Sequence, residues 1–285
     1  MVSEKPWKPE AVALLLGGIF LSLSLGALLG GIVGRFENSI PRAQVEFYGT
    51  VVSTVVFQLG SLVCIGVFLR MQRLSLGEAF GIRFGGLGWV LLWGVGTAVV
   101  AVPVTLALNR LMFHLLEAIQ VQPVQQTTVT VLRTSISLGH QVYLAVVTVI
   151  LAPVIEELLF RGVLYSSLKQ IRLTGVARWL RKALYPRLVW RGHRRLAARV
   201  RAASHRIGTR GSVLLALVMS SVLFGIIHLN LMTLVPLTVL AMLLAILYER
   251  TGNLLAPIIA HSLFNLVNFV ALLLQTRSDM VVPPV

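Results

Sequence analysis

Long apolar runs dominate the chain and restrict the fold that it can adopt. Hydrophobic residues make up 56% of the 285 positions and charged residues only 12%, whereas soluble domains typically carry about 25% charged residues. Backbone polar groups find no water inside a bilayer, so a spanning segment must be a helix or a strand of a closed barrel. The runs do not alternate with polar residues as barrel strands do. The sequence therefore predicts an all-α, polytopic transmembrane helical bundle.

Seven runs reach or approach the ~20 residues that a helix needs to cross a bilayer. They are residues 11–33, 47–69, 88–112, 141–164, 212–229, 231–248 and 254–275. The first is too long for the apolar part of a cleaved signal peptide, so we expect a retained helix. Gly26 and Gly30, with Gly34 directly after the run, recur every four residues, which favours close packing on another helix of the chain over dimerisation. Residues 70–87 are predicted to be a loop, and 113–140 a short interfacial helix followed by a loop.

Basic residues are distributed unevenly between these runs. Segment 165–211 holds thirteen of the 25 Lys and Arg residues and no acid. With a cytoplasmic N-terminus, the inner segments carry nineteen basic residues and the outer segments five, in agreement with the positive-inside rule. Within this basic loop, residues 176–200 interleave Trp, Leu and Arg, as an interfacial helix on anionic lipid headgroups does. A simple topology anchor is the alternative. The net charge of +15 also permits nucleic-acid binding, but a Trp-bearing stretch interrupted by Pro suits a membrane surface better.

The fourth run carries charges that helix packing does not require. Glu156 and Glu157 are adjacent, and Arg161 follows Glu157 by four residues, which places these two on one helix face. A charge at this depth costs about 2.5–3.5 kcal/mol on insertion scales, so such residues are functional candidates. A salt bridge that only holds helices together is the alternative. Pro153 precedes the acids, and a proline frees a backbone carbonyl one turn earlier and bends its helix.

Two later runs add polar side chains at the same spacing. Phe224 and His228 lie four residues apart in the fifth run, and His261 and Asn265 four apart in the seventh. A lone histidine in a membrane helix is more often a packing residue than a catalyst. Polar residues on three separate runs instead favour one shared site.

These side chains suit the hydrolysis of an amide in two ways. A carboxylate beside a histidine can take a proton from water and pass it to the leaving amine, while a second histidine and an asparagine donate to the carbonyl oxygen as it gains charge. Alternatively, His228, His261 and Glu156 can hold zinc with an open position while the other glutamate acts as the base. No HExxH motif is present, and the sequence leaves both versions open. The single cysteine, Cys64, excludes an internal disulfide and a Cys-rich metal site.

The three motifs EExxxR, FxxxH and HxxxN, in this order on apolar runs, resemble the CAAX prenyl protease and bacteriocin-processing (CPBP or Abi) family. They occupy residues 156–161, 224–228 and 261–265, and the resemblance covers about residues 142–270. It implies an intramembrane endopeptidase of about eight spans with its active site inside the bundle. It also implies that Glu156 activates the attacking water together with His228.

Further roles follow from the same resemblance. His261 and Asn265 would bind the oxyanion, and Glu157 and Arg161 would orient the site. The substrate would be a peptide or protein, prenylated or membrane-bound. Zinc is implied only as a possible cofactor, because a metal-dependent and a glutamate-dependent, metal-free mechanism compete for this family. Residues 1–140 would form the N-terminal helices, and residues 141–275 a catalytic core interrupted by the basic loop 165–211.

Two other classes of function are compatible with the sequence. A non-enzymatic immunity or scaffold protein of this fold would use the polar cluster for binding. A proton-coupled transporter would use the Glu and His side chains as a proton path. The complete motif set favours the protease, because loss of activity usually erodes at least one member.

Overall fold

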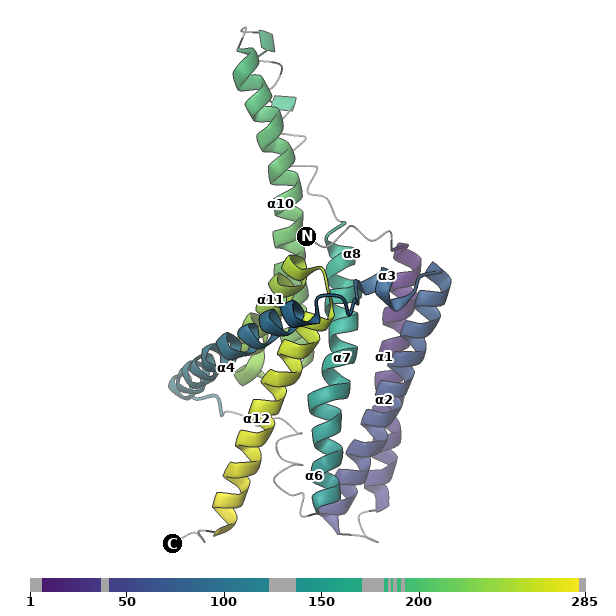
Figure 1. Cartoon of the computed structure of the whole chain (residues 1–285). Coiled ribbons are helices and arrows are strands. Elements are labelled where there is room, and N and C mark those ends of the chain that lie inside the picture. Colours follow the sequence, from purple (N-terminus) through teal and green to yellow (C-terminus); the bar gives the residue numbers. More distant parts are fainter. Residues whose placement is uncertain are drawn as a thin grey trace.

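The computed structural model describes residues 7–36, 41–122, 137–170 and 193–281, together with positions 182, 183, 186, 189 and 190. Within these ranges the chain forms helices and no strand, which confirms the predicted all-α bundle (Figure 1). The first half contains α1 (Pro9–Val33), the 3-10 turn η1 (Gly34–Phe36), α2 (Arg42–Gln72), α3 (Leu76–Phe80) and α4 (Leu87–Ala118). The second half contains α6 (Leu138–Ala145), η2 (Val146–Leu151), α7 (Ala152–Glu157), η3 (Leu158–Tyr165), α8 (Ser166–Leu168), α10 (Arg194–Ile227), α11 (Leu231–Thr251) and α12 (Leu255–Val281).

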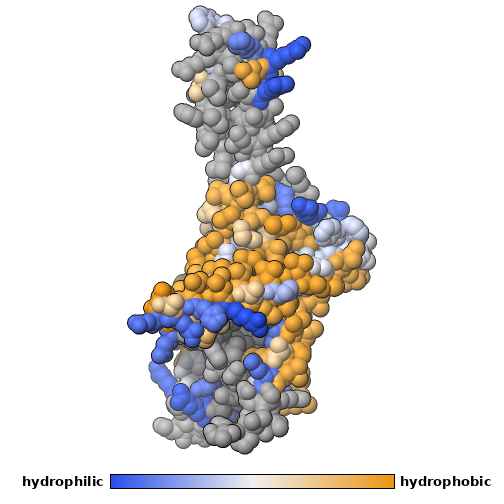
Figure 2. Space-filling model, turned by 90° about the vertical axis from the view of Figure 1, so that its left-hand side faces the viewer, coloured by the Kyte–Doolittle hydropathy of each residue, from blue (hydrophilic) through white to orange (hydrophobic). Residues whose placement is uncertain are grey.

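The helices follow the predicted runs closely. Six are long and apolar enough to cross a membrane, and the end of α10 forms a shorter apolar helix over Gly211–Ile227. One of the six, Leu138–Leu168, joins α6, η2, α7, η3 and α8 without a break; we call it the glutamate span. Figure 2 shows apolar side chains gathered in a broad band across the molecule, as expected where lipid replaces water. The chain is an integral, multi-pass membrane protein, and its cytoplasmic N-terminus stays a prediction.

Two connecting segments differ from their predictions. Residues 70–87 contain α3, which begins with a capping box: Ser75 Oγ accepts from the Glu78 N–H, and the Glu78 carboxylate accepts from the Ser75 N–H. Residues 113–118 continue α4 instead of forming a separate interfacial helix, because the helix-forming stretch NRLMFHLLEA has no break at its start. Most of the loop predicted after it, residues 123–136, lies outside the described residues.

The predicted basic loop 165–211 is partly helical. Its first residues complete the glutamate span, and from Arg194 onward it belongs to α10, which continues unbroken into the fifth predicted span. Figure 1 shows this beginning of α10 extending away from the bundle. The interfacial helix predicted over residues 176–200 lies largely outside the described residues. Docking of this segment to anionic lipid therefore stays a prediction.

Helices α1 and α2 form a close pair because glycines line their contact (Figure 1). A Cβ on Gly26 would lie 2.6 Å from the Ser53 carbonyl oxygen, and a Cβ on Gly30 would lie 2.7 Å from the Gly49 carbonyl oxygen. Both glycines thus pack within the chain, as predicted. Gly34 does not take part, because it begins η1 and a Cβ there would meet nothing within 4 Å.

We expect Gly30→Leu to destabilise the protein by about 1–3 kcal/mol, because the added side chain must separate two helices that touch through their backbones. The midpoint of thermal unfolding in detergent measures this loss. Gly31→Leu is the matched control, since a Cβ at Gly31 would meet no atom within 4 Å. Equal midpoints for the two variants would contradict the packing described here.

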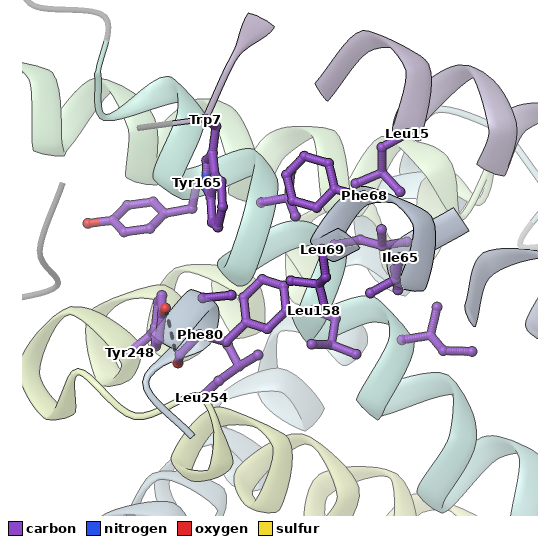
Figure 3. Close-up of a cluster of buried hydrophobic side chains, with 14 of the residues drawn as sticks. Trp7, Leu15, Ile65, Phe68, Leu69, Phe80, Leu158, Tyr165, Tyr248 and Leu254 are labelled. Carbon is purple, nitrogen blue, oxygen red and sulfur yellow. Dashed lines mark hydrogen bonds between the residues drawn. The ribbon is translucent and has the colours of Figure 1, made fainter. Parts of the chain in front are cut away.

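A buried cluster ties the N-terminal part of the chain to the glutamate span (Figure 3). The Trp7 ring lies 5.1 Å from Phe68 and 6.3 Å from Phe80, measured between ring centroids. The Phe80 carbonyl accepts a hydrogen bond from the Tyr248 hydroxyl at 3.3 Å. A Cβ on Gly162 would lie 2.6 Å from the Phe80 ring, so this glycine admits the ring against the glutamate span. Three separate parts of the fold thus meet at Phe80, two at its ring and one at its backbone carbonyl.

A second cluster joins the same two parts of the chain at another place. Val90 and Ala101 of α4 are buried together with Leu240 and Leu244 of α11 and Phe264 of α12. Helix α4 packs on both α11 and α12. Residues 1–140 and 141–275 therefore share their hydrophobic cores.

Candidate active site

The glutamate span is an irregular helix. Two π-helical segments, η2 and η3, stand on either side of α7, the short α-helical segment that ends in Glu156 and Glu157. Pro153 lies at the start of α7 and has no N–H to continue the ladder of hydrogen bonds. Wide turns of this kind are rare and occur frequently at functional sites. The acidic pair therefore sits on one regular turn between two irregular ones.

Glu157 is the anchor of the site. Its side chain is 0% exposed, and its Oε1 accepts from Arg161 Nη1 at 2.7 Å and from His261 Nδ1 at 2.8 Å. Arg161, 3% exposed, also donates through Nη2 to the Ala241 carbonyl of α11 at 3.2 Å. Charges buried this deeply are stable only when paired and hydrogen-bonded. These contacts hold three helices together around one carboxylate.

Glu156 lies on the other side of His261. Its Oε2 is 3.7 Å from His261 Nε2, so the imidazole lies between the two acids. Glu157 Oε1 already accepts from Arg161, and we assign His261 Nδ1 as the donor of the second hydrogen bond to this oxygen. The Glu156 side chain is 24% exposed, in contrast to the closed environment of Glu157. Neighbouring residues on a helix point in different directions, and here Glu157 is fully buried while Glu156 is partly exposed.

His228 is held by its own helix. Its Nδ1 lies 2.8 Å from the Phe224 carbonyl oxygen. A carbonyl can only accept, so Nδ1 carries the proton and the neutral imidazole has its lone pair at Nε2. The histidine forms the C-cap of α10, and the next residue, Leu229, adopts a left-handed conformation with φ 48°. Asn230 then caps α11 through Oδ1. This tight hairpin fixes His228 at the end of its helix.

Phe224 connects the basic groups. Its ring is fully buried, with Arg161 Cζ 4.8 Å from its centroid. The His228 and His261 rings lie 4.9 Å and 5.8 Å from the same centroid. The adjacent Gly225 allows the approach of α10 to α11, because a Cβ there would lie 2.8 Å from the Leu234 carbonyl oxygen. The guanidinium thus has a cation–π contact in addition to its hydrogen bonds.

Asn265 follows His261 by one turn of α12. Its Nδ2 donates to the carbonyl of Thr148, in η2 of the glutamate span, at 2.8 Å. Within the described part of the chain, this is the hydrogen bond that its side chain makes. Asn265 therefore contacts the glutamate span at Thr148, which precedes Glu156 and Glu157 in the sequence.

Comparison with known families finds a match to the part of the chain that contains these residues. Residues 138–267, just under half of the chain, match the family model described as type II CAAX prenyl endopeptidase Rce1-like. This segment belongs to the Rce1-like family. It begins with the glutamate span and ends just past Asn265, so it contains all three motifs. No curated protein and no solved structure matches the chain.

The Rce1-like segment therefore confirms the predicted membership of the CAAX protease family. Glu157 contacts both Arg161 and His261, and Glu156 lies next to His261. His228 contacts the Phe224 ring, which also contacts Arg161 and His261. The roles of these residues stay predictions.

Three groups that contact the site residues have no role predicted from the sequence. Phe224 was visible in the FxxxH motif, and its position one turn before a candidate histidine was the available signal. The carbonyls of Ala241 and Thr148 have no signal in the sequence, because any residue type can supply a backbone oxygen.

The possible zinc site of the Rce1-like segment finds little support in this geometry. In the described ranges, no three His, Cys, Asp or Glu side chains are grouped so that they could hold a metal ion. The set proposed from sequence was His228, His261 and Glu156. Each histidine has its Nδ1 engaged and its Nε2 available, but the three side chains do not form one ligand group.

Proposed function

We propose that this chain is an intramembrane endopeptidase that hydrolyses a peptide bond with water activated by Glu156 and His228, without a covalent intermediate. Membership of a peptidase family supports the reaction class. The observation that carries the proposal is the contrast within the acidic pair: Glu157 is closed off and paired to Arg161, while Glu156 is partly exposed beside His261. One acid is fixed as scaffold, and its neighbour is left free to exchange a proton.

In the first step Glu156 removes a proton from a water molecule, assisted by the lone pair of His228 Nε2. The water oxygen forms a bond to the carbonyl carbon of the substrate, and the π electrons of that carbonyl move to its oxygen. The product of this step is a tetrahedral oxyanion. Inside an apolar bundle a donor attracts this oxyanion more strongly than in water, because bulk water does not screen the interaction.

In the second step the oxyanion collapses and the carbon–nitrogen bond breaks. The proton held by Glu156 passes to the leaving nitrogen, and the amine then takes the second proton of the water from the new carboxylic acid. The products are a carboxylate and a protonated amine. In this scheme His261 enters the reaction with a proton on each ring nitrogen and keeps both. Glu157 accepts from its Nδ1–H, and its Nε2–H, beside Glu156, donates to the oxyanion. Glu157 and Arg161 act by fixing the direction of this imidazole. The resemblance assigns Asn265 to the same oxyanion.

We favour the metal-free version, because the candidate zinc ligands are not grouped in the described part of the chain. Purified protein is therefore expected to retain most of its activity after dialysis against EDTA or 1,10-phenanthroline, and to contain less than one zinc per chain by elemental analysis. Loss of activity that added zinc restores would overturn this version and leave the peptidase itself in place.

The substrate class in this proposal is a membrane-bound protein with a prenylated C-terminal CAAX sequence, following the family description. The test compares new protein N-termini and C-termini in cells that express wild type or Glu156→Ala at matched levels. Cuts that appear only with wild type support the protease and identify its substrates. If the two profiles agree while both proteins are folded in the membrane, the scaffold or transporter function replaces it.

A further inference from the structure

We infer that Asn265 is a positioning residue whose side chain replaces a backbone donor missing from the glutamate span, and so holds Glu156 and Glu157 in register with His261. The inference rests on the proposed function for its catalytic consequence. It gives Asn265 a different role from the oxyanion contact implied by the resemblance, and it assigns roles to Thr148 and Pro153.

The missing donor follows from the backbone of the glutamate span. The Ala152 N–H bonds to the Val147 carbonyl, five residues back, so it does not serve Thr148 as it would in an α-helix. The wide register would next bring residue 153 to the Thr148 carbonyl. Residue 153 is proline and has no N–H. The backbone of the glutamate span therefore offers the Thr148 carbonyl oxygen no N–H donor, neither four nor five residues further on. This oxygen lies inside an apolar bundle, where an unsatisfied carbonyl is costly.

Asn265 meets this carbonyl from another helix. Its Nδ2 donates to the Thr148 oxygen at 2.8 Å. Asn268, less than one turn further along α12, shows the ordinary alternative: its Nδ2 donates at 2.8 Å to the Phe264 carbonyl of its own helix. Two asparagines on one helix thus make bonds of equal length, one local and one to the break in the glutamate span.

The bond is placed where it can control the acids. His261 and Asn265 are separated by one turn of α12, and they contact the glutamate span at Glu157 and Thr148 respectively. Side chains of a helix lean toward its N-terminus, while its carbonyls point toward its C-terminus. The two contacts therefore approach α7 from its two ends. Loss of the Asn265 contact would leave α7 held at Glu157 alone, and a rotation of α7 moves Glu156 away from His261.

A rescue experiment separates this role from direct contact with the oxyanion. Asn265→Ala, Pro153→Ala and the double variant are assayed with a fluorogenic farnesylated CAAX peptide. We expect Asn265→Ala to lower kcat by roughly 10- to 100-fold, the scale of a small misplacement of catalytic groups, with little change in KM. Pro153→Ala returns an N–H at the position that the Thr148 carbonyl lacks. It is therefore expected to recover most of the lost kcat in the Asn265→Ala background.

The thermal unfolding midpoints of the same four proteins form a second cycle that needs no substrate. They are expected to be non-additive, with Pro153→Ala less harmful in the Asn265→Ala background than in wild type. If Asn265→Ala is too unstable to purify, size-exclusion chromatography measures the same coupling. The double variant is then expected to regain a monodisperse peak that Asn265→Ala lacks. Asn268→Ala is the matched control, and Pro153→Ala should show no coupling with it in either cycle.

Additive effects in both cycles would overturn the inference and return Asn265 to a direct role at the substrate. Coupling in stability without recovery of kcat would also overturn it, because the bond would then be structural only. If wild type cleaves neither the probe nor any cellular protein, the proposed function fails, and the stability cycle still decides whether Asn265 replaces the missing donor.

Discussion

Glu156→Gln is expected to reduce kcat for a farnesylated CAAX peptide by about 10³-fold or more, the upper range for removal of a general base. Glutamine has nearly the same shape and can still hydrogen-bond near His261, but it cannot take a proton from water. The side chain is partly exposed, so the change leaves no buried charge unpaired and the unfolding midpoint should stay close to that of wild type. Initial rates with the purified proteins at matched concentration measure the effect.

Glu117→Gln is the appropriate control for this experiment. Glu117 lies near the end of α4, its side chain is 53% exposed, and its neighbour is His114 at 3.5 Å. It is an acid beside a histidine that takes no part in the site. A Glu156→Gln protein that keeps more than about a tenth of the wild-type rate would remove Glu156 from the centre of the mechanism.

Arg161→Ala is expected to have the largest effect on stability. It removes the cation 2.7 Å from the fully buried Glu157 and leaves the Ala241 carbonyl without the donor Nη2. Breaking one side of a buried ion pair costs about 3–5 kcal/mol, because the remaining charge has no water to replace its partner. Reversible unfolding in mixed detergent micelles measures the loss, and peptide cleavage should fall with it, since His261 loses the fixed carboxylate that orients it.

The chain offers a matched pair for comparison. Arg42 and Glu46 of α2 also form an Arg–Glu pair at i,i+4, at 3.0 Å, but their side chains are 78% and 37% exposed. Arg42→Ala is expected to cost at most about 1 kcal/mol, because water takes over from the lost partner. The double variant Glu157→Gln/Arg161→Met should be more stable than Arg161→Ala alone. A similar loss of unfolding free energy for Arg161→Ala and Arg42→Ala would show that removal of Arg161 does not leave Glu157 as an unpaired buried charge.

Hydropathy predicts most of the fold, and motif spacing selects several side chains that the structure places in contact. All seven apolar runs are helical, because each must satisfy its own backbone bonds in lipid. Six of them lie in helices long enough to cross a membrane, and the fifth forms the shorter apolar end of α10. Helix α3 was missed, although Ser75 and Glu78 carry the spacing of a capping box. The motif residues Glu157, Arg161 and His261 lie in contact, because a polar group in a membrane span is stable only beside other polar groups of the bundle.

The finer geometry could not be predicted, and the reasons are physical. Hydropathy reports which face of a helix is apolar, but it does not distinguish bonds to residue i−4 from bonds to residue i−5. The wide turns around α7 were therefore invisible, although Pro153 marked the place. The bonds of Arg161 to the Ala241 carbonyl and of Asn265 to the Thr148 carbonyl depend on how helices dock. Their partners are backbone atoms, which leave no trace in a pattern of residue types.

The part of the chain that matches the family is not a unit that can stand alone. Ile155 and Leu158, on either side of the acidic pair, are buried in the same cluster as Trp7 and Phe68, which precede the matched residues. Gly162, beside Arg161, accommodates the ring of Phe80. The wall that supports the acidic pair is thus built from helices that carry none of the motifs. Transplanting residues 138–267 into another membrane scaffold would move the motif residues without this support, and we expect a chimera to keep the proposed activity only if it also carries the first four helices.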